Sequence, residues 1–157
     1  MKKPEPLDRV LEVATLRRDN ARAALARALQ ERQQAERQGV QLQDYASEAQ
    51  TRWSQKAAQG VTPELLYHHR QFMARIDQAV EFQRGVVQRL QLQVDHHQHE
   101  LLLAERSLAG LGKFDEKRQQ SWLHHQNRLE QKNNDEMAAH LHRRNQSNFQ
   151  SLGNHTP

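Results

Sequence analysis

Apolar residues recur along the first third of the chain at alternating steps of three and four. The series is Leu11, Ala14, Arg18, Ala21, Leu25, Ala28, Arg32, Ala35, Gly39, Leu42, Ala46, Ala49 and Trp53, and all of its members except Arg18, Arg32 and Gly39 are apolar. A spacing that averages 3.5 residues over several heptads is typical of a helix that packs along a partner helix in a coiled coil. Six of the thirteen members are alanines, each of which buries little area, so the helix depends on its partner for stability.

A second series of the same period follows. It contains Ile76, Val80, Gln83, Val87, Leu90, Val94, His97, Leu101, Ala104, Leu108 and Leu111. Leucine and valine dominate this series, so it predicts a stronger apolar seam than the first. We therefore expect the second helix to be the partner of the first.

The residues between the two series predict a sharp reversal of the chain. Gly60 suits the left-handed conformation that ends many helices, the Thr62 hydroxyl can cap the next helix, and Pro63 suits its first turn. The helices then run antiparallel, which places Leu42 near Gln78 and Leu11 near Ala109. The sequence thus predicts an all-α fold, a long two-helix antiparallel coiled-coil hairpin.

The first helix ends its pairing near Gly110-Leu111-Gly112, and there we expect a frayed or bent second helix, since two glycines cost about 2 kcal/mol of helix propensity. Beyond them the chain is mostly charged or amide, and its last residues are rich in Asn, Ser and Gly. The expected divisions are an N-terminal tail (1–6), a first coiled-coil helix (7–59), a turn (60–63), a paired second helix (64–112), an unpaired overhanging helix (113–145) and a disordered tail (146–157).

Composition agrees with an elongated fold. The 157 residues are 36% hydrophobic and 5% aromatic, with a mean hydropathy of −1.04, too polar for a compact core. The net charge is +4, but basic and acidic residues are interspersed, which favours a solvated helical surface over a nucleic-acid-binding one. There is no cysteine, no signal peptide and no apolar run of membrane-spanning length, so any membrane contact is expected to be peripheral.

The sequence lacks the motifs that carry catalysis. It contains no Gly-rich phosphate loop, no His-Glu-x-x-His zinc motif and no nucleophile elbow. His96, His99 and Glu100 are about one turn apart and could ligate a metal, but they match no known spacing. We therefore expect no enzyme activity, no catalytic residue, no cofactor and no metal site.

A further apolar stripe lies on the second helix and turns away from the seam. It contains Phe72, Ile76, Ala79 and Val86, and antiparallel pairing brings Tyr45 beside it. Two interpretations remain open. The stripe is either a docking patch for another protein, or a local widening of the hairpin's own core near the turn.

Three segments resemble the flagellar export protein FliJ family. They are Leu42-Gln-Asp-Tyr-Ala-Ser-Glu48, Phe72-Met-Ala-Arg-Ile-Asp-Gln-Ala-Val-Glu-Phe-Gln83 and Glu130-Gln-Lys-Asn-Asn-Asp-Glu-Met-Ala138. Their order, their spacing and the total length all match, so the resemblance covers nearly the whole chain. The Glu-Gln-Lys-x-x-Asp-Glu segment and the Phe-x-x-x-Ile-x-x-Ala stripe are its most specific parts.

This resemblance implies a cytoplasmic component of the flagellar type III export apparatus, peripheral at the inner membrane, with a coiled coil similar to a rotary-ATPase central stalk. The implied partners are the export ATPase hexamer, whose ring assembly the protein would promote, the export-gate membrane protein, and export chaperones. The implied gate-binding patch is Gln38, Leu42, Tyr45, Phe72, Ile76, Ala79 and Gln83. The implied ATPase-end residues are Glu130, Gln131, Lys132, Asp135 and Glu136.

Two alternatives share the predicted architecture. One is the corresponding stalk protein of a virulence injectisome, which would be told apart by the ATPase that it stimulates. The other is a structural coiled coil that only self-associates, in which a dimer would bury the Phe72 stripe.

Overall fold

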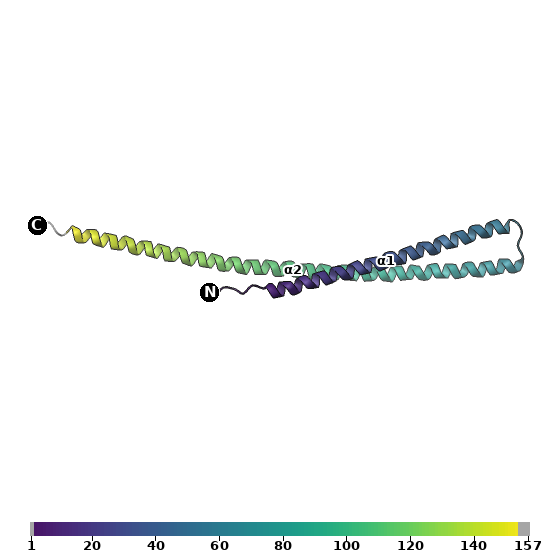
Figure 1. Cartoon of the computed structure of the whole chain (residues 1–157), viewed down its shortest axis with the longest axis horizontal. Coiled ribbons are helices and arrows are strands. Elements are labelled where there is room, and N and C mark those ends of the chain that lie inside the picture. The colour runs from purple at the N-terminus through teal and green to yellow at the C-terminus, as the bar shows by residue number, and fades with distance from the viewer. Residues whose placement is uncertain (1, 154–157) are drawn as a thin grey trace. The chain divides into compact units, whose positions relative to one another are not determined.

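Two long helices account for almost all of the computed structural model, which describes residues 2–153. Helix α1 spans Asp8–Ala57 and helix α2 spans Pro63–Leu152 (Figure 1). No strand occurs among the described residues. The predicted all-α hairpin of two packed helices is therefore confirmed.

The turn between the helices uses the residues that the sequence indicates. Gly60 has a φ of 98°, in the left-handed region that favours glycine, and its N–H donates to the Ala57 carbonyl oxygen at 3.0 Å. The Thr62 hydroxyl oxygen accepts a hydrogen bond from the Leu65 N–H at 3.3 Å, as expected of a helix cap. Pro63 is the first residue of α2, where its missing N–H costs nothing.

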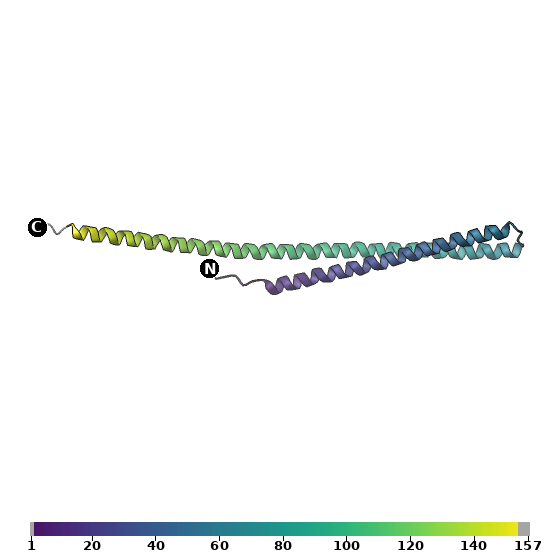
Figure 2. The ribbon, with the colours of Figure 1, turned by 45° about the horizontal axis from the view of Figure 1, so that its top comes forward.

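The chain divides into two compact units, and α2 contributes to both. The first unit, residues 12–108, is the hairpin itself, in which α1 and α2 lie side by side in both ribbon views (Figures 1 and 2). The second unit combines residues 1–11 with residues 109–157.

Both predicted seams form the contact between the helices of the hairpin. Every member of the first series from Ala14 to Trp53, and every member of the second from Ile76 to Leu108, is buried or half-buried. Few of the described side chains are buried, namely Ala14, Ala28, Ala35, Ile76 and Val94, and of these Val94 is fully buried. The core is thus one residue deep, as expected of two helices without a third layer.

Polar contacts across the hairpin confirm the antiparallel register. The Arg32 guanidinium donates to the Gln91 side-chain oxygen at 2.7 Å, and the Trp53 ring stacks on His69 with centroids 4.0 Å apart. Further along, Arg22 lies 3.7 Å from the Glu105 carboxylate. Each pair joins residues at similar distances from Gly60 along the two arms.

In the second unit, the N-terminal residues extend the pairing past the expected end at Gly112. The Gln119 side-chain amide donates to the Pro4 carbonyl oxygen at 3.4 Å, and the Lys3 ammonium lies 5.5 Å from the centroid of the Trp122 ring. Half-buried positions continue to Gln126. The expectation that residues 113–145 are unpaired throughout was therefore wrong for their first part, because Lys3 and Pro4, which lie before α1, contact α2 there.

Helix α2 also continues through two places where the sequence predicted interruptions. Gly110 and Gly112 are helical, and so are residues 146–152 of the expected disordered tail. Isolated glycines lower helix stability but leave the backbone hydrogen bonds intact, and no further glycine occurs before Gly153, whose N–H donates to the Phe149 carbonyl oxygen. The remainder of that expected tail, residues 154–157, lies outside the described part of the chain.

Candidate functional site

The aromatic residues of the predicted gate-binding patch are Tyr45 of α1 and Phe72 of α2, and both are exposed. Their rings meet edge to face, with centroids 6.1 Å apart and planes at 80°. This geometry is a favourable arrangement for two aromatic rings. Even so, Tyr45 remains 46% and Phe72 40% exposed. The pair therefore joins the two helices on one flank of the hairpin and still presents apolar surface to solvent.

Gln83 and Leu42 extend this surface away from the turn. Together with Gln38, Gln41 and Tyr45 they line a shallow hollow of about 350 Å³. Within it the Gln83 side-chain amide donates to the Gln38 side-chain oxygen at 3.3 Å. An apolar floor bordered by amide groups can accept both a hydrophobic side chain and hydrogen bonds from a partner.

The structure brings together most of the residues assigned to the patch, with one difference in role. Gln38, Leu42, Tyr45 and Gln83 share one hollow, and Phe72 touches Tyr45. Ala79 is half-buried on α2. Ile76, however, is only 6% exposed and belongs to the hairpin core, so its side chain is not available to a partner.

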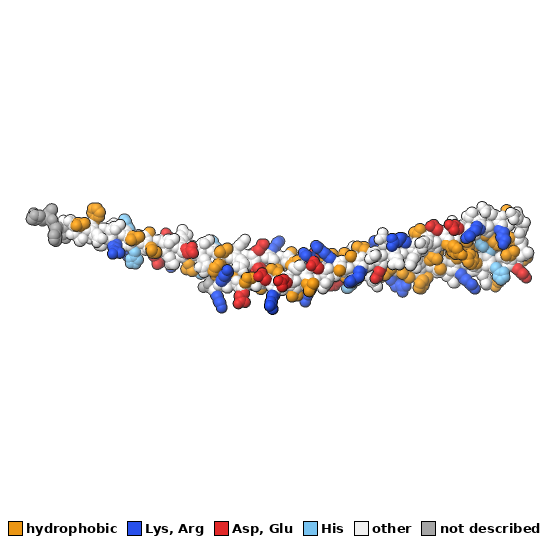
Figure 3. Space-filling model, in the orientation of Figure 1, with side chains coloured by type: hydrophobic (Ala, Val, Ile, Leu, Met, Phe, Trp, Pro, Cys, Tyr) orange, Lys and Arg blue, Asp and Glu red, His pale blue; other side chains and the backbone are white. Residues whose placement is uncertain are grey.

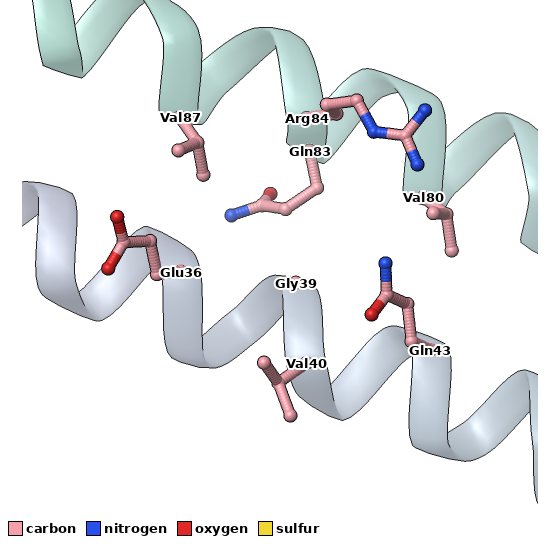
Figure 4. Close-up of a pocket in the computed structure, with 8 residues that line it drawn as sticks. All are labelled: Glu36, Gly39, Val40, Gln43, Val80, Gln83, Arg84 and Val87. Carbon is pink, nitrogen blue, oxygen red and sulfur yellow. The ribbon is translucent and has the colours of Figure 1, made fainter.

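Sequence reasoning missed a second hollow, on the flank that carries Val40. It has a volume of about 230 Å³ and is lined by Glu36, Gly39, Val40, Gln43, Val80, Gln83, Arg84 and Val87 (Figure 4). Gln83 points from α2 towards α1 at the level of Gly39 (Figure 4). Its side-chain amide donates to the Ala35 carbonyl oxygen at 2.9 Å. The sequence could have indicated this hollow through Gly39, because a glycine at a seam position has no side chain to fill the space between the helices.

The predicted ATPase-end residues lie on the last part of α2, in the second unit. Glu130, Gln131, Lys132, Asp135 and Glu136 are all exposed. Among the described residues, none of these five side chains makes a hydrogen bond or an ion pair. They present charge and amide groups to solvent on a helix that is exposed all round from Asn127 onwards.

Hydrophobic side chains are scattered over the visible face of the molecule, and several gather on the hairpin towards the turn (Figure 3). Across residues 2–153, no group of three His, Asp or Glu side chains is placed to hold a metal ion. Neither described helix has a stretch long and apolar enough to cross a membrane.

Comparison with protein families places the chain alongside one known family model. The model described as Flagellar FliJ protein matches residues 1–147, which is nearly the whole chain. Comparisons with curated proteins and with solved structures gave no match.

Proposed function

Because this chain belongs to the flagellar FliJ family, we propose that it is a non-enzymatic stalk component of the flagellar type III protein export apparatus. Family membership gives the role in flagellar export. The proposal adds that the protein promotes assembly of the export ATPase ring and links that ring to the export-gate membrane protein at the cytoplasmic face of the inner membrane. Escort of export chaperones belongs to the same proposal.

The observation that carries the proposed gate contact is the exposed Tyr45–Phe72 pair. A two-helix hairpin has no third layer to cover these rings, and large aromatic side chains are the residues that most often dominate binding energy at interfaces. The amides of Gln38 and Gln83 beside them supply hydrogen bonds. We assign Ile76 a positioning role, since it supports this surface from the core.

Binding of the cytoplasmic domain of the export-gate protein tests this surface. We expect Phe72→Ala and Tyr45→Ala each to weaken binding at least tenfold, the effect of removing an interface anchor of about 1.4 kcal/mol or more. Helicity should stay unchanged, because both rings lie outside the core.

Tyr67→Ala is the matched control. Tyr67 is an aromatic residue of α2 that is 59% exposed, and helical spacing places it on the side facing away from α1. Equal binding by all three variants and the unchanged protein would contradict the proposed patch. An equal loss in Tyr67→Ala would show that the contact is not specific to the Tyr45–Phe72 flank.

The proposed ATPase contact is supported by the exposure of residues 130–136 and by their match to the family's terminal motif. A component that binds the assembled ring better than its separate subunits raises apparent ATPase activity by mass action, without chemistry of its own. The protein then needs only binding surfaces in its two units.

A further inference from the structure

The last thirty residues of α2 form an exposed helix with a seam that has the same spacing in both directions and similar residues at three of five mirrored positions. Counting forward from Leu123, steps of 4, 3, 4 and 3 reach Asn127, Glu130, Asn134 and Met137. Counting backward from Leu152, the same steps reach Asn148, Asn145, Leu141 and Ala138. At about 100° per residue, all ten positions fall within roughly a third of the helix circumference.

This stripe carries apolar side chains that nothing in the described chain covers. Leu123 is 53% exposed, Met137 65%, Leu141 58% and Leu152 78%. The N-terminal residues meet α2 just before the stripe begins, where Pro4 contacts Gln119, one turn before Leu123, and Lys3 lies over Trp122. The stripe is therefore free over its whole length.

We propose that this stripe binds the same stripe of a second copy of the chain, forming an antiparallel helix pair. Superposing the reversed pattern on itself pairs like residues at three of the five facing positions: Leu123 faces Leu152, Asn127 faces Asn148, and Met137 faces Ala138. At the other two, Glu130 faces Asn145 and Asn134 faces Leu141. Apolar pairs lie at the ends and at the centre, and paired asparagines at seam positions are a known means of setting register in coiled coils.

Charge favours the same arrangement. Acidic residues occur before Met137, at Glu130, Asp135 and Glu136, whereas none occurs after it and Arg143 and Arg144 follow. In the antiparallel register Glu130 of one copy meets Asn145 and the adjacent Arg144 of the other, and symmetry makes this contact twice. A parallel pair would instead place Glu130 opposite Glu130 and Arg144 opposite Arg144. Charge complementarity thus favours the antiparallel orientation of the two helices over the parallel one.

The association is expected to be weak and reversible. Four of the ten seam positions in each copy are asparagine and one is glutamate, so little apolar area is buried. The pair would cover Glu130, one of the residues proposed for the ATPase contact. Self-association and ATPase binding would then exclude each other, which would keep unengaged copies apart from the ring.

Sedimentation equilibrium of the full chain at low salt tests the pairing, with Glu130→Arg and Arg144→Glu as variants. Each variant alone puts like charges at both symmetric contacts, so its dimer should weaken roughly tenfold. A mixture of the two variants should recover the original affinity, because every contact between unlike copies is then complementary. This recovery cannot come from a change in folding of either variant.

The matched controls are Glu136→Arg and Arg143→Glu, which make the same charge changes on the opposite side of the helix and should leave the affinity unchanged. Since the chain has no cysteine, Asn127→Cys and Asn148→Cys variants should cross-link to each other with a short bismaleimide, and neither to itself. A monomer up to about 0.5 mM, mixed variants no tighter than either alone, or Asn127→Cys cross-linking to itself would each overturn the proposal.

Discussion

Gln83 is a polar residue within the apolar seam, and its hydrogen bonds help to set the register between the two helices. Its amide donates to the Ala35 carbonyl oxygen at 2.9 Å, and its side chain passes over Gly39, where an added Cβ would lie 3.6 Å from the Gln83 Cγ. A half-buried amide with defined partners penalises any shift of one helix along the other, because a shift would leave it without those partners. The seam position and its polarity were both visible in the sequence, but the partner atom was not.

Ile76 and Phe72 are one helical turn apart and have opposite exposures, which gives a prediction at the residue scale. Ile76→Ala removes a buried side chain and should lower the free energy of unfolding by about 2–3 kcal/mol. Phe72→Ala removes a ring that is already 40% exposed and should cost clearly less. Urea denaturation followed by circular dichroism at 222 nm measures both. An Ile76→Ala variant as stable as the unchanged protein would contradict the core assignment.

At the scale of the element, the two helices differ in what holds them. Among the described residues, helix α1 contributes three of the five buried ones, all alanines, and so depends on packing against α2. The last part of α2, from Asn127 onwards, has no packing at all. Its helical state rests on the propensity of residues such as Glu, Gln, Lys, Leu and Arg, and on the absence of glycine and proline before Gly153.

Replacing glycine by alanine should change the stability of the protein in opposite directions at Gly110 in α2 and at Gly60 in the turn. Gly110 is helical and an added Cβ would meet nothing within 4 Å, so Gly110→Ala should stabilise the protein by about 0.5–1 kcal/mol. Gly60 has a φ of 98°, which L-residues rarely adopt, so Gly60→Ala should destabilise it by about 1 kcal/mol or more. Thermal unfolding of both variants checks the two signs together.

At the scale of the whole molecule, the proposed contacts lie in different units of the chain. The gate patch belongs to residues 12–108, whereas the ATPase-end residues and the self-pairing stripe belong to the unit that includes residues 109–157. The two functions should therefore be separable by deletion.

A chain that ends after Gln126 keeps every half-buried position and loses all the ATPase-end residues. We expect the full chain to stimulate the flagellar export ATPase at limiting enzyme concentration, and the shortened chain to lose most of that stimulation while binding the gate domain normally. The ATP hydrolysis rate and the gate pull-down are the two measurements. Full stimulation by the shortened chain would move the ATPase contact to the paired helices.

The sequence by itself determined the helices, the turn and the antiparallel register. These follow from local rules: the heptad period selects the buried face, and a glycine, a threonine and a proline at fixed spacing end one helix and begin the next. The neighbours Tyr45 and Phe72 were also predictable, since pairing about a known turn places residues by counting alone.

The tertiary structure alone decided which candidate side chains remain accessible. Ile76 belongs to both the seam and the stripe by spacing, and only packing against α1 shows that it is buried. Likewise, the polar N-terminal residues carry no periodic signal, so their contacts with Gln119 and Trp122 could not be read from a pattern. Periodicity assigns residues to faces of a helix, but burial depends on how far the neighbouring segment covers each face.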